Sequence, residues 1–228
     1  MRDLNQEIYS YLLQYPPALE MYDMLEKTGN IYLIGGILRE YKDKGEIQKI
    51  RDIDIIIEVT VESYWQELLK KYQPKKNKFG GYKLSCSGLI VDIWELKETW
   101  AYRNKLIPCN STDYLKKLPD TVFLNIDAII YDLKRNIWYD EKYQQAMQSK
   151  IIDVVLEKNP QILLNIVRAL VLRKQYKMSF SEKLINIIKE EEQHYSNFLD
   201  VLMYIQQERY NKKILQRKEI EEELKGFV

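Results

Sequence analysis

Two apolar runs joined by a polar segment, within residues 31–58 (IYLIGGILREYKDKGEIQKIRDIDIIIE), most constrain how this chain can fold. The first run ends in Gly35-Gly36, which is typical of a buried strand that turns sharply into the start of a helix. The second run carries Asp52 and Asp54, and residues two apart in a strand point to the same side of a sheet. We therefore expect two convergent carboxylates beside a turn where backbone N–H groups can approach a ligand.

The composition of the 228 residues is that of an ordinary globular protein, with 46% apolar and 30% charged residues. Lys and Arg total 35 against 34 Asp and Glu, so no overall attraction to nucleic acid or membrane follows from the charge. Two cysteines and a single histidine argue against a disulfide scaffold, structural zinc and histidine catalysis. Because the sequence has neither a membrane-span pattern nor the apolar core of a signal peptide, we expect a cytoplasmic protein without membrane contact.

The rest of the chain divides into an α/β front and a helical back. Helical spacing or punctuation predicts helices over residues 4–14, 17–27, 36–41, 62–72 and 112–118. Apolar runs predict strands over residues 31–34, 53–58, 82–86, 88–96 and 122–131. From about residue 141 only helical spacing is apparent, over residues 151–157, 161–177, 182–193 and 195–224.

A third carboxylate, Asp92, interrupts the apolar strand GLIVDIWEL. Burying an uncompensated carboxylate is costly, so a cluster of Asp52, Asp54 and Asp92 would suit a divalent cation. Mg²⁺ fits best, with Mn²⁺ as an alternative, because it binds a few carboxylates together with water and substrate phosphates. Two such ions would activate a hydroxyl and stabilise a leaving pyrophosphate. Each signal alone has a simpler explanation: strand-end carboxylates commonly bind water or a lysine, and a glycine pair is commonly just a turn.

The order of these signals resembles a known family. GGILRE followed by RDIDIII is similar to the head signature GGxxRD then DxD of the nucleotidyltransferases that include bacterial poly(A) polymerases and tRNA CCA-adding enzymes. TVFLNIDAIIYDL (121–133) is similar to that family's segment ending in FTINALAYD, and LEKNPQILLNIVRAL (156–170) to its neck motif. The resemblance implies an α+β, Pol β-type head over residues 1–140, with a mixed, mostly antiparallel sheet flanked by helices. An all-helical neck and C-terminal part would follow over residues 141–228.

The resemblance also implies an activity: Mg²⁺-dependent transfer of NMP from an NTP to a hydroxyl on RNA, a small molecule or a protein, with release of pyrophosphate. The implied catalytic and metal-binding residues are Asp52, Asp54 and Asp92. The implied nucleotide-binding residues are Gly35, Gly36, Arg39, Asn159 and Arg168.

Departures from the family pattern favour an alternative, a catalytically inactive module that binds nucleotide or protein. The family's RRD is replaced at residues 121–123 by Thr-Val-Phe. In the neck, the family's base-selecting Asp and Arg fall on Asn159 and Ile162, and Ile162 cannot donate a hydrogen bond. CCA-type base selection is therefore not expected, although Arg168 matches a neck arginine.

Two further surfaces have open interpretations. Residues 70–83 (KKYQPKKNKFGGYK) contain six lysines and no acid, which suits contact with RNA through charge and aromatic stacking, or simply a solvated lysine hairpin. Trp94, Trp100 and Tyr102 lie near Asp92 in the sequence, where they could line an acceptor pocket or belong to the core.

Overall fold

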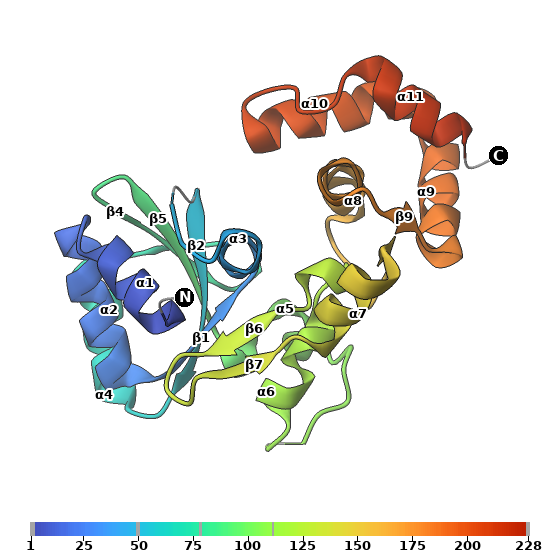
Figure 1. The fold of residues 1–228 in the computed structure, drawn as a ribbon. Coiled ribbons are helices and arrows are strands. Elements are labelled where there is room, and N and C mark those ends of the chain that lie inside the picture. The colour runs from blue at the N-terminus through green and yellow to red at the C-terminus, as the bar shows by residue number, and fades with distance from the viewer. Residues whose placement is uncertain (1–2, 49–50, 78, 111, 227–228) are drawn as a thin grey trace. The chain divides into compact units, whose positions relative to one another are not determined.

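The computed structural model describes residues 3–48, 51–77, 79–110 and 112–226 (Figure 1). The chain folds as two units: Met1–Thr121 with Asp127–Glu141, and Val122–Ile126 with Lys142–Val228. The predicted boundary at residues 140/141 lies next to the one at Glu141, while the second unit also takes Val122–Ile126 from within the predicted head.

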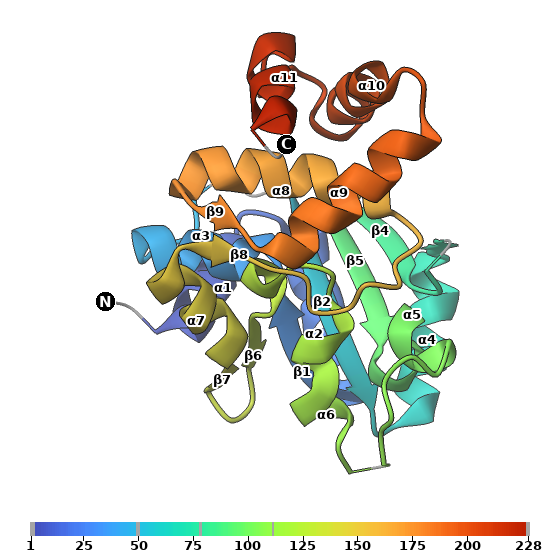
Figure 2. The same cartoon turned by 90° about the vertical axis from the view of Figure 1, so that its right-hand side faces the viewer.

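The first unit is built on one mixed sheet with the strand order β3-β4-β5-β2-β1-β6-β7. Among the described strands of this sheet, β2 and β5 pair in parallel and every other neighbouring pair is antiparallel, which confirms the predicted mixed, mostly antiparallel sheet. Figure 2 shows β1, β2, β5 and β4 side by side. The strand bounds are β1 Gly29–Ile34, β2 Asp52–Val59, β3 Lys75–Lys76, β4 Tyr82–Cys86, β5 Leu89–Glu95, β6 Ile130–Asp132 and β7 Ile137–Tyr139.

Three helices lie together on one side of this sheet: α1 (Leu4–Leu12), α2 (Pro16–Thr28) and α4 (Glu62–Tyr72) (Figure 1). The fully buried Trp65 of α4 packs edge-on against the ring of Tyr82 in β4, with ring centres 5.5 Å apart, and donates its indole N–H to Glu95. Helix α3 (Gly36–Lys44) follows β1 directly and packs on β1 and β2. The buried sides of these helices therefore cover one face of the sheet, in agreement with the predicted sheet flanked by helices.

The opposite face is covered by the segment after β5, which forms η1 (Leu96–Glu98), α5 (Trp100–Arg103), α6 (Tyr114–Lys117) and η2 (Leu118–Thr121). Its Tyr102 and Leu118 pack on Tyr32 and Ile56 of the sheet, and Trp94 packs against the same cluster. Burial strongly raises the pKa of the Tyr102 phenol, whose O–H donates to the Tyr114 carbonyl at 2.6 Å. Tyr102 is thus a core residue, whereas Trp94 is partly buried at the edge of this cluster.

The strand predicted over residues 122–131 is wrong. Asn125 exchanges hydrogen bonds with Asp153, its backbone N–H donating to the Asp153 carbonyl at 2.9 Å and its side-chain oxygen accepting the Asp153 N–H at 2.9 Å. Because of these bonds, Val122–Ile126 belongs to the second unit. The short helix η3 (Asn125–Asp127) then leads to β6. A continuous apolar run does not by itself fix a strand, because it also suits a buried irregular segment.

The second unit is mostly helical, with bounds α7 Glu141–Ser149, α8 Ile162–Tyr176, α9 Glu182–His194, α10 Phe198–Tyr210 and α11 Arg217–Lys225. The helix predicted over residues 151–157 is wrong: β8 (Ile151–Ile152) pairs in parallel with β9 (Ser179–Phe180), in keeping with the β-branched residues of this stretch.

The single helix predicted over residues 195–224 is also wrong, because α10 ends where Asn211 adopts a left-handed conformation with φ 51°. The buried Gln206 then exchanges two hydrogen bonds with the backbone of Leu215. No helix in the described parts of the chain is both long and apolar enough to cross a membrane.

Candidate functional site

The pairing of β2 with β5 places Asp54 directly opposite Asp92. Paired residues on neighbouring strands share one face of the sheet, and the strands lie about 4.8 Å apart. Asp52, two residues before Asp54, lies on the same face. The row continues on the antiparallel neighbours, with Lys83 of β4 opposite Asp92 and Ile34 of β1 opposite Asp54. Asp54 and Asp92 are thus direct neighbours across two strands, while the predicted convergence of Asp52 with Asp54 stays a prediction.

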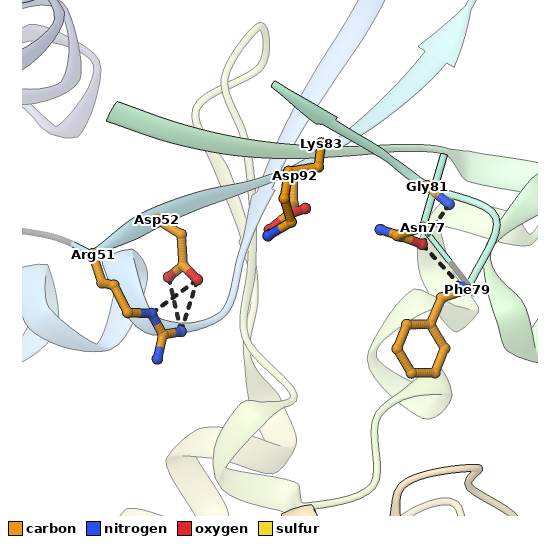
Figure 3. Close-up of polar contacts among 7 residues, drawn as sticks. All are labelled: Arg51, Asp52, Asn77, Phe79, Gly81, Lys83 and Asp92. Carbon is orange, nitrogen blue, oxygen red and sulfur yellow. Dashed lines mark hydrogen bonds and ion pairs between the residues drawn. The ribbon is translucent and has the colours of Figure 1, made fainter. Parts of the chain in front are cut away.

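Asp92 is buried, with 6% of its surface exposed. The ammonium of Lys83 donates to its Oδ2 at 2.8 Å (Figure 3). Its Oδ1 has no hydrogen-bond partner among the described residues. Because buried carboxylate oxygens are normally hydrogen-bonded, this oxygen marks a position where a further partner would be accommodated.

Asp52 is held by its neighbour in the chain. The guanidinium of Arg51 contacts both carboxylate oxygens, the shortest bond running from Nη2 to Oδ2 at 2.7 Å (Figure 3). The Arg51 side chain is 47% exposed, so this pair is open to solvent and contributes little to stability. Asp52 can therefore exchange its partner more easily than a buried acid could.

Gly35 connects β1 to α3 in a conformation that favours glycine, with φ 78° and ψ −139°. A Cβ atom at this position would lie 3.0 Å from Oδ2 of Asp54. The turn therefore brings bare backbone, and the N-terminus of α3 with its positive partial charge, directly to that carboxylate. Gly36 is different, since the nearest atom to a Cβ there would be Nη2 of Arg39 at 3.8 Å.

Arg39 forms an ion pair with Asp127 of η3, and both side chains are largely buried, at 14% and 8% exposure. Sequence reasoning gave Arg39 a role in triphosphate binding but missed Asp127. The signal was present, because Asp127 is an acid inside the apolar run FLNIDAIIYDL, the same pattern that drew attention to Asp92. The pair anchors the start of α3 to the segment leading into β6.

The predicted nucleotide contacts of the neck, Asn159 and Arg168, belong to the second unit. The side-chain oxygen of Asn159 accepts hydrogen bonds from the Gln161 N–H at 2.9 Å and the Asn165 amide at 3.0 Å. Asn159 thus stabilises the start of α8, on which Arg168 is half-buried. Their role toward a nucleotide stays a prediction.

The lysines of residues 70–83 do not act as one uniform patch. Lys71 pairs with Glu20 at 2.6 Å, and Lys76 lies 5.5 Å from the ring centre of Tyr82. Lys83 is paired with Asp92 in the candidate site. Of the remaining lysines, Lys70 and Lys75 are exposed, and Lys78 lies outside the described residues.

The turn between β3 and β4 is held by hydrogen bonds and packs against Trp94 of β5. Asn77 Oδ1 accepts the backbone N–H groups of Phe79 at 2.9 Å and Gly81 at 3.0 Å (Figure 3). A Cβ atom at Gly81 would lie 2.2 Å from Nε1 of Trp94, so only glycine lets the turn approach the Trp94 indole this closely. The Gly80-Gly81 pair thus forms the turn that leads into β4.

Within the described ranges, no group of three or more acidic, histidine or cysteine side chains is arranged to hold a metal ion. Asp52 is turned toward Arg51 and Asp92 toward Lys83, so the three-carboxylate metal set stays a prediction. The carboxylates of Asp54 and Asp92 nevertheless fit Mg²⁺, which needs only one or two carboxylates when substrate phosphates complete its ligands. The unpartnered Oδ1 of the buried Asp92, opposite Asp54, is the observation that supports this fit.

The sequence matches no family model and no curated protein sequence. Solved structures are similar in fold. A CCA-adding enzyme in complex with ATP is 18% identical, with a TM-score of 0.61 over 97% of this chain and 53% of that one. The Thermotoga maritima CCA-adding enzyme in complex with tRNA is 19% identical, with a TM-score of 0.60 over 96% and 53%. A tRNA nucleotidyltransferase with a primer tRNA and an incoming ATP analogue is 17% identical, with a TM-score of 0.56 over 87% and 57%.

At these identities the likeness establishes the fold, and it confirms the predicted resemblance and fold class. The chain spans slightly more than half the length of each of these proteins.

Proposed function

We propose that this chain is a nucleotidyltransferase that moves NMP from an NTP to a hydroxyl of an RNA acceptor and releases pyrophosphate, in a Mg²⁺-dependent reaction. The observation that carries the proposal is the direct register of Asp54 with Asp92 beside the Gly35 turn. The fold adds support, since similar structures are enzymes in complex with ATP, CTP or tRNA. We expect the protein to act in the cytoplasm, where these substrates are found.

The roles of the residues follow from their positions on the sheet. Asp54 and Asp92 would hold Mg²⁺, joined by Asp52 once it releases Arg51. When bound, the ion would polarise the transferred phosphate and stabilise the leaving pyrophosphate. Backbone N–H groups at the start of α3, after the turn at Gly35-Gly36, would bind the β- and γ-phosphates, as helix N-termini bind anions elsewhere.

Recognition of base and acceptor would use other residues. Asn159 and Arg168 are the proposed nucleotide contacts of the second unit, and Ile162 offers the base no hydrogen bond. The exposed lysines of residues 70–83, Lys70 and Lys75 among them, are proposed to contact the RNA backbone. A small molecule or protein hydroxyl would instead make little use of this lysine surface.

The decisive experiment is incubation of the protein with Mg²⁺, each α-labelled NTP and total RNA, followed by gel analysis of the RNA. We expect label transfer by the wild type, loss of at least 100-fold in Asp54→Asn and Asp92→Asn, and no change in Asp23→Asn, whose carboxylate is exposed on α2. Robust transfer by the Asp54→Asn/Asp92→Asn double variant would sink the proposal.

A second candidate is the catalytically inactive nucleotide-binding or protein-interaction module. The ion pairs of Asp52 with Arg51, Asp92 with Lys83 and Arg39 with Asp127 favour it, because they neutralise groups that catalysis would require. This candidate predicts nucleotide binding, measured by calorimetry, without turnover of any NTP. Measurable incorporation that depends on Asp54 would exclude it.

A further inference from the structure

Lys83 and Asp92 face each other across the β4–β5 pair, and their side chains are joined at 2.8 Å. The two ends of this ion pair differ in exposure. The Asp92 side chain is 9% exposed, while that of Lys83 is 51% exposed. The carboxylate is thus fixed in the sheet, whereas the lysine reaches it from the solvent side on a flexible four-carbon stem.

The charge of Asp92 needs compensation where it lies. A buried carboxylate without a partner is unfavourable, and Asp54, opposite Asp92 on the neighbouring strand, is a second acidic residue on the same face of the sheet. Among the lysines of residues 70–83 that the structure describes, Lys83 is the one whose ion pair is with a candidate catalytic carboxylate. Lys83 therefore supplies positive charge where a divalent cation would otherwise supply it.

A divalent cation bound to the Asp92 carboxylate, at the open Oδ1, would lie close to the ammonium group on Oδ2. The two positive charges repel each other, so the cation binds less tightly while Lys83 stays on Asp92. A nucleoside triphosphate lowers the free-energy cost of displacing Lys83, because its phosphate oxygens offer the displaced ammonium a new anionic partner.

We propose that Lys83 is a displaceable counter-ion: it neutralises Asp92 in the nucleotide-free protein and moves to a phosphate of the NTP when the metal–nucleotide complex binds. Metal and nucleotide then bind cooperatively, since the metal frees the Lys83 ammonium for the nucleotide phosphate and the nucleotide draws this ammonium away from the metal site. The inference rests on the proposed function for the identity of the ligands, but its test does not depend on turnover.

The test measures Mn²⁺ binding by electron paramagnetic resonance, with and without a non-hydrolysable NTP analogue. We expect Lys83→Met to tighten binding of Mn²⁺ alone by about fivefold or more, and to weaken the enhancement by nucleotide by a similar factor. Lys83→Arg should retain weak metal binding because it keeps the charge. Lys134→Met is the matched control, since this lysine also makes a side-chain hydrogen bond, to Asn30, at another part of the same unit.

The wild type gives an independent measurement should Lys83→Met fail to fold. Acylation by an amine-reactive reagent, read by mass spectrometry, should increase at Lys83 when Mn²⁺ is added alone and decrease when the nucleotide analogue is added as well. Labelling of Lys134 should stay constant. Lys83 labelling that ignores Mn²⁺, or unchanged Mn²⁺ affinity in a folded Lys83→Met, would overturn the proposal.

The two proposals fail separately. Cooperative binding of Mn²⁺ and nucleotide that depends on Lys83, without any label transfer, would support the counter-ion and refute the nucleotidyltransferase. Label transfer together with metal binding that does not depend on Lys83 would support the nucleotidyltransferase and refute the counter-ion.

Discussion

Gly35→Ala is the substitution that tests the site most directly. At φ 78° and ψ −139° an alanine is strained, at a cost of about 1–3 kcal/mol. Its Cβ would also lie 3.0 Å from Oδ2 of Asp54, so the carboxylate must shift by a few tenths of an ångström. We therefore expect both a loss of stability and a loss of any activity that depends on Asp54.

Gly36→Ala is the matched comparison for stability. Its Cβ would meet nothing closer than 3.8 Å, and alanine is favoured over glycine in helices by up to about 1 kcal/mol. Two adjacent glycines are thus expected to respond to the same change with opposite signs, Gly35→Ala destabilising and Gly36→Ala neutral or stabilising.

Urea unfolding followed by tryptophan fluorescence suits this comparison, because the four tryptophans (Trp65, Trp94, Trp100 and Trp138) all belong to the first unit. Equal unfolding free energies of the two variants, within about 0.5 kcal/mol, would refute the reasoning, since they would show that the turn accommodates a side chain at either position.

Three further substitutions have defined outcomes. Burial, reinforced by nearby carboxylates, raises the pKa of Glu95, so the folded protein holds this proton more tightly than the unfolded chain and stability falls as pH rises from 4.5 through the folded-state pKa. Glu95→Gln should therefore raise Tm at pH 7 and leave it unchanged at pH 4, and an equal effect at both values would contradict this. Asp127→Ala leaves the guanidinium of Arg39 largely buried without this partner, and should lower the unfolding free energy by about 3 kcal/mol in the fluorescence assay; a loss below about 1 kcal/mol would mean that the pair is dispensable. Gln206→Met removes both hydrogen bonds to the Leu215 backbone and should cost about 2 kcal/mol, measured by circular dichroism of the helices, whereas a neutral effect would show that the link after α10 does not need them.

The sequence predicted those elements whose local pattern has one physical solution. Residues 62–72 carry apolar side chains at helical spacing, and residues 82–86 are a strand with the predicted bounds. Residues 151–157 failed because a short apolar segment suits a strand and a helix equally well until its partner is known, and here the partner is β9.

The candidate site was predictable as a set of residue types but not as a set of pairs. Asp52, Asp54 and Asp92 could be placed on neighbouring strands from pattern alone. Their partners Arg51 and Lys83 could not be assigned, because side-chain pairing across strands depends on register, and register is a property of the folded sheet.

Register is also what makes the site specific. Within the described sheet, β2 and β5 are the parallel pair, and a slip of one residue between them would turn Asp92 to the face that carries Ile93. On the other side of β5, the two-residue turn Ser87-Gly88 has positive φ at both positions, 52° and 88°, as a type I′ hairpin turn requires. This turn sets β4 against β5 so that Lys83 meets Asp92. The counter-ion and the carboxylate pair are therefore positioned by separate features of the sequence, the hairpin turn for one and the packing of two apolar strands for the other.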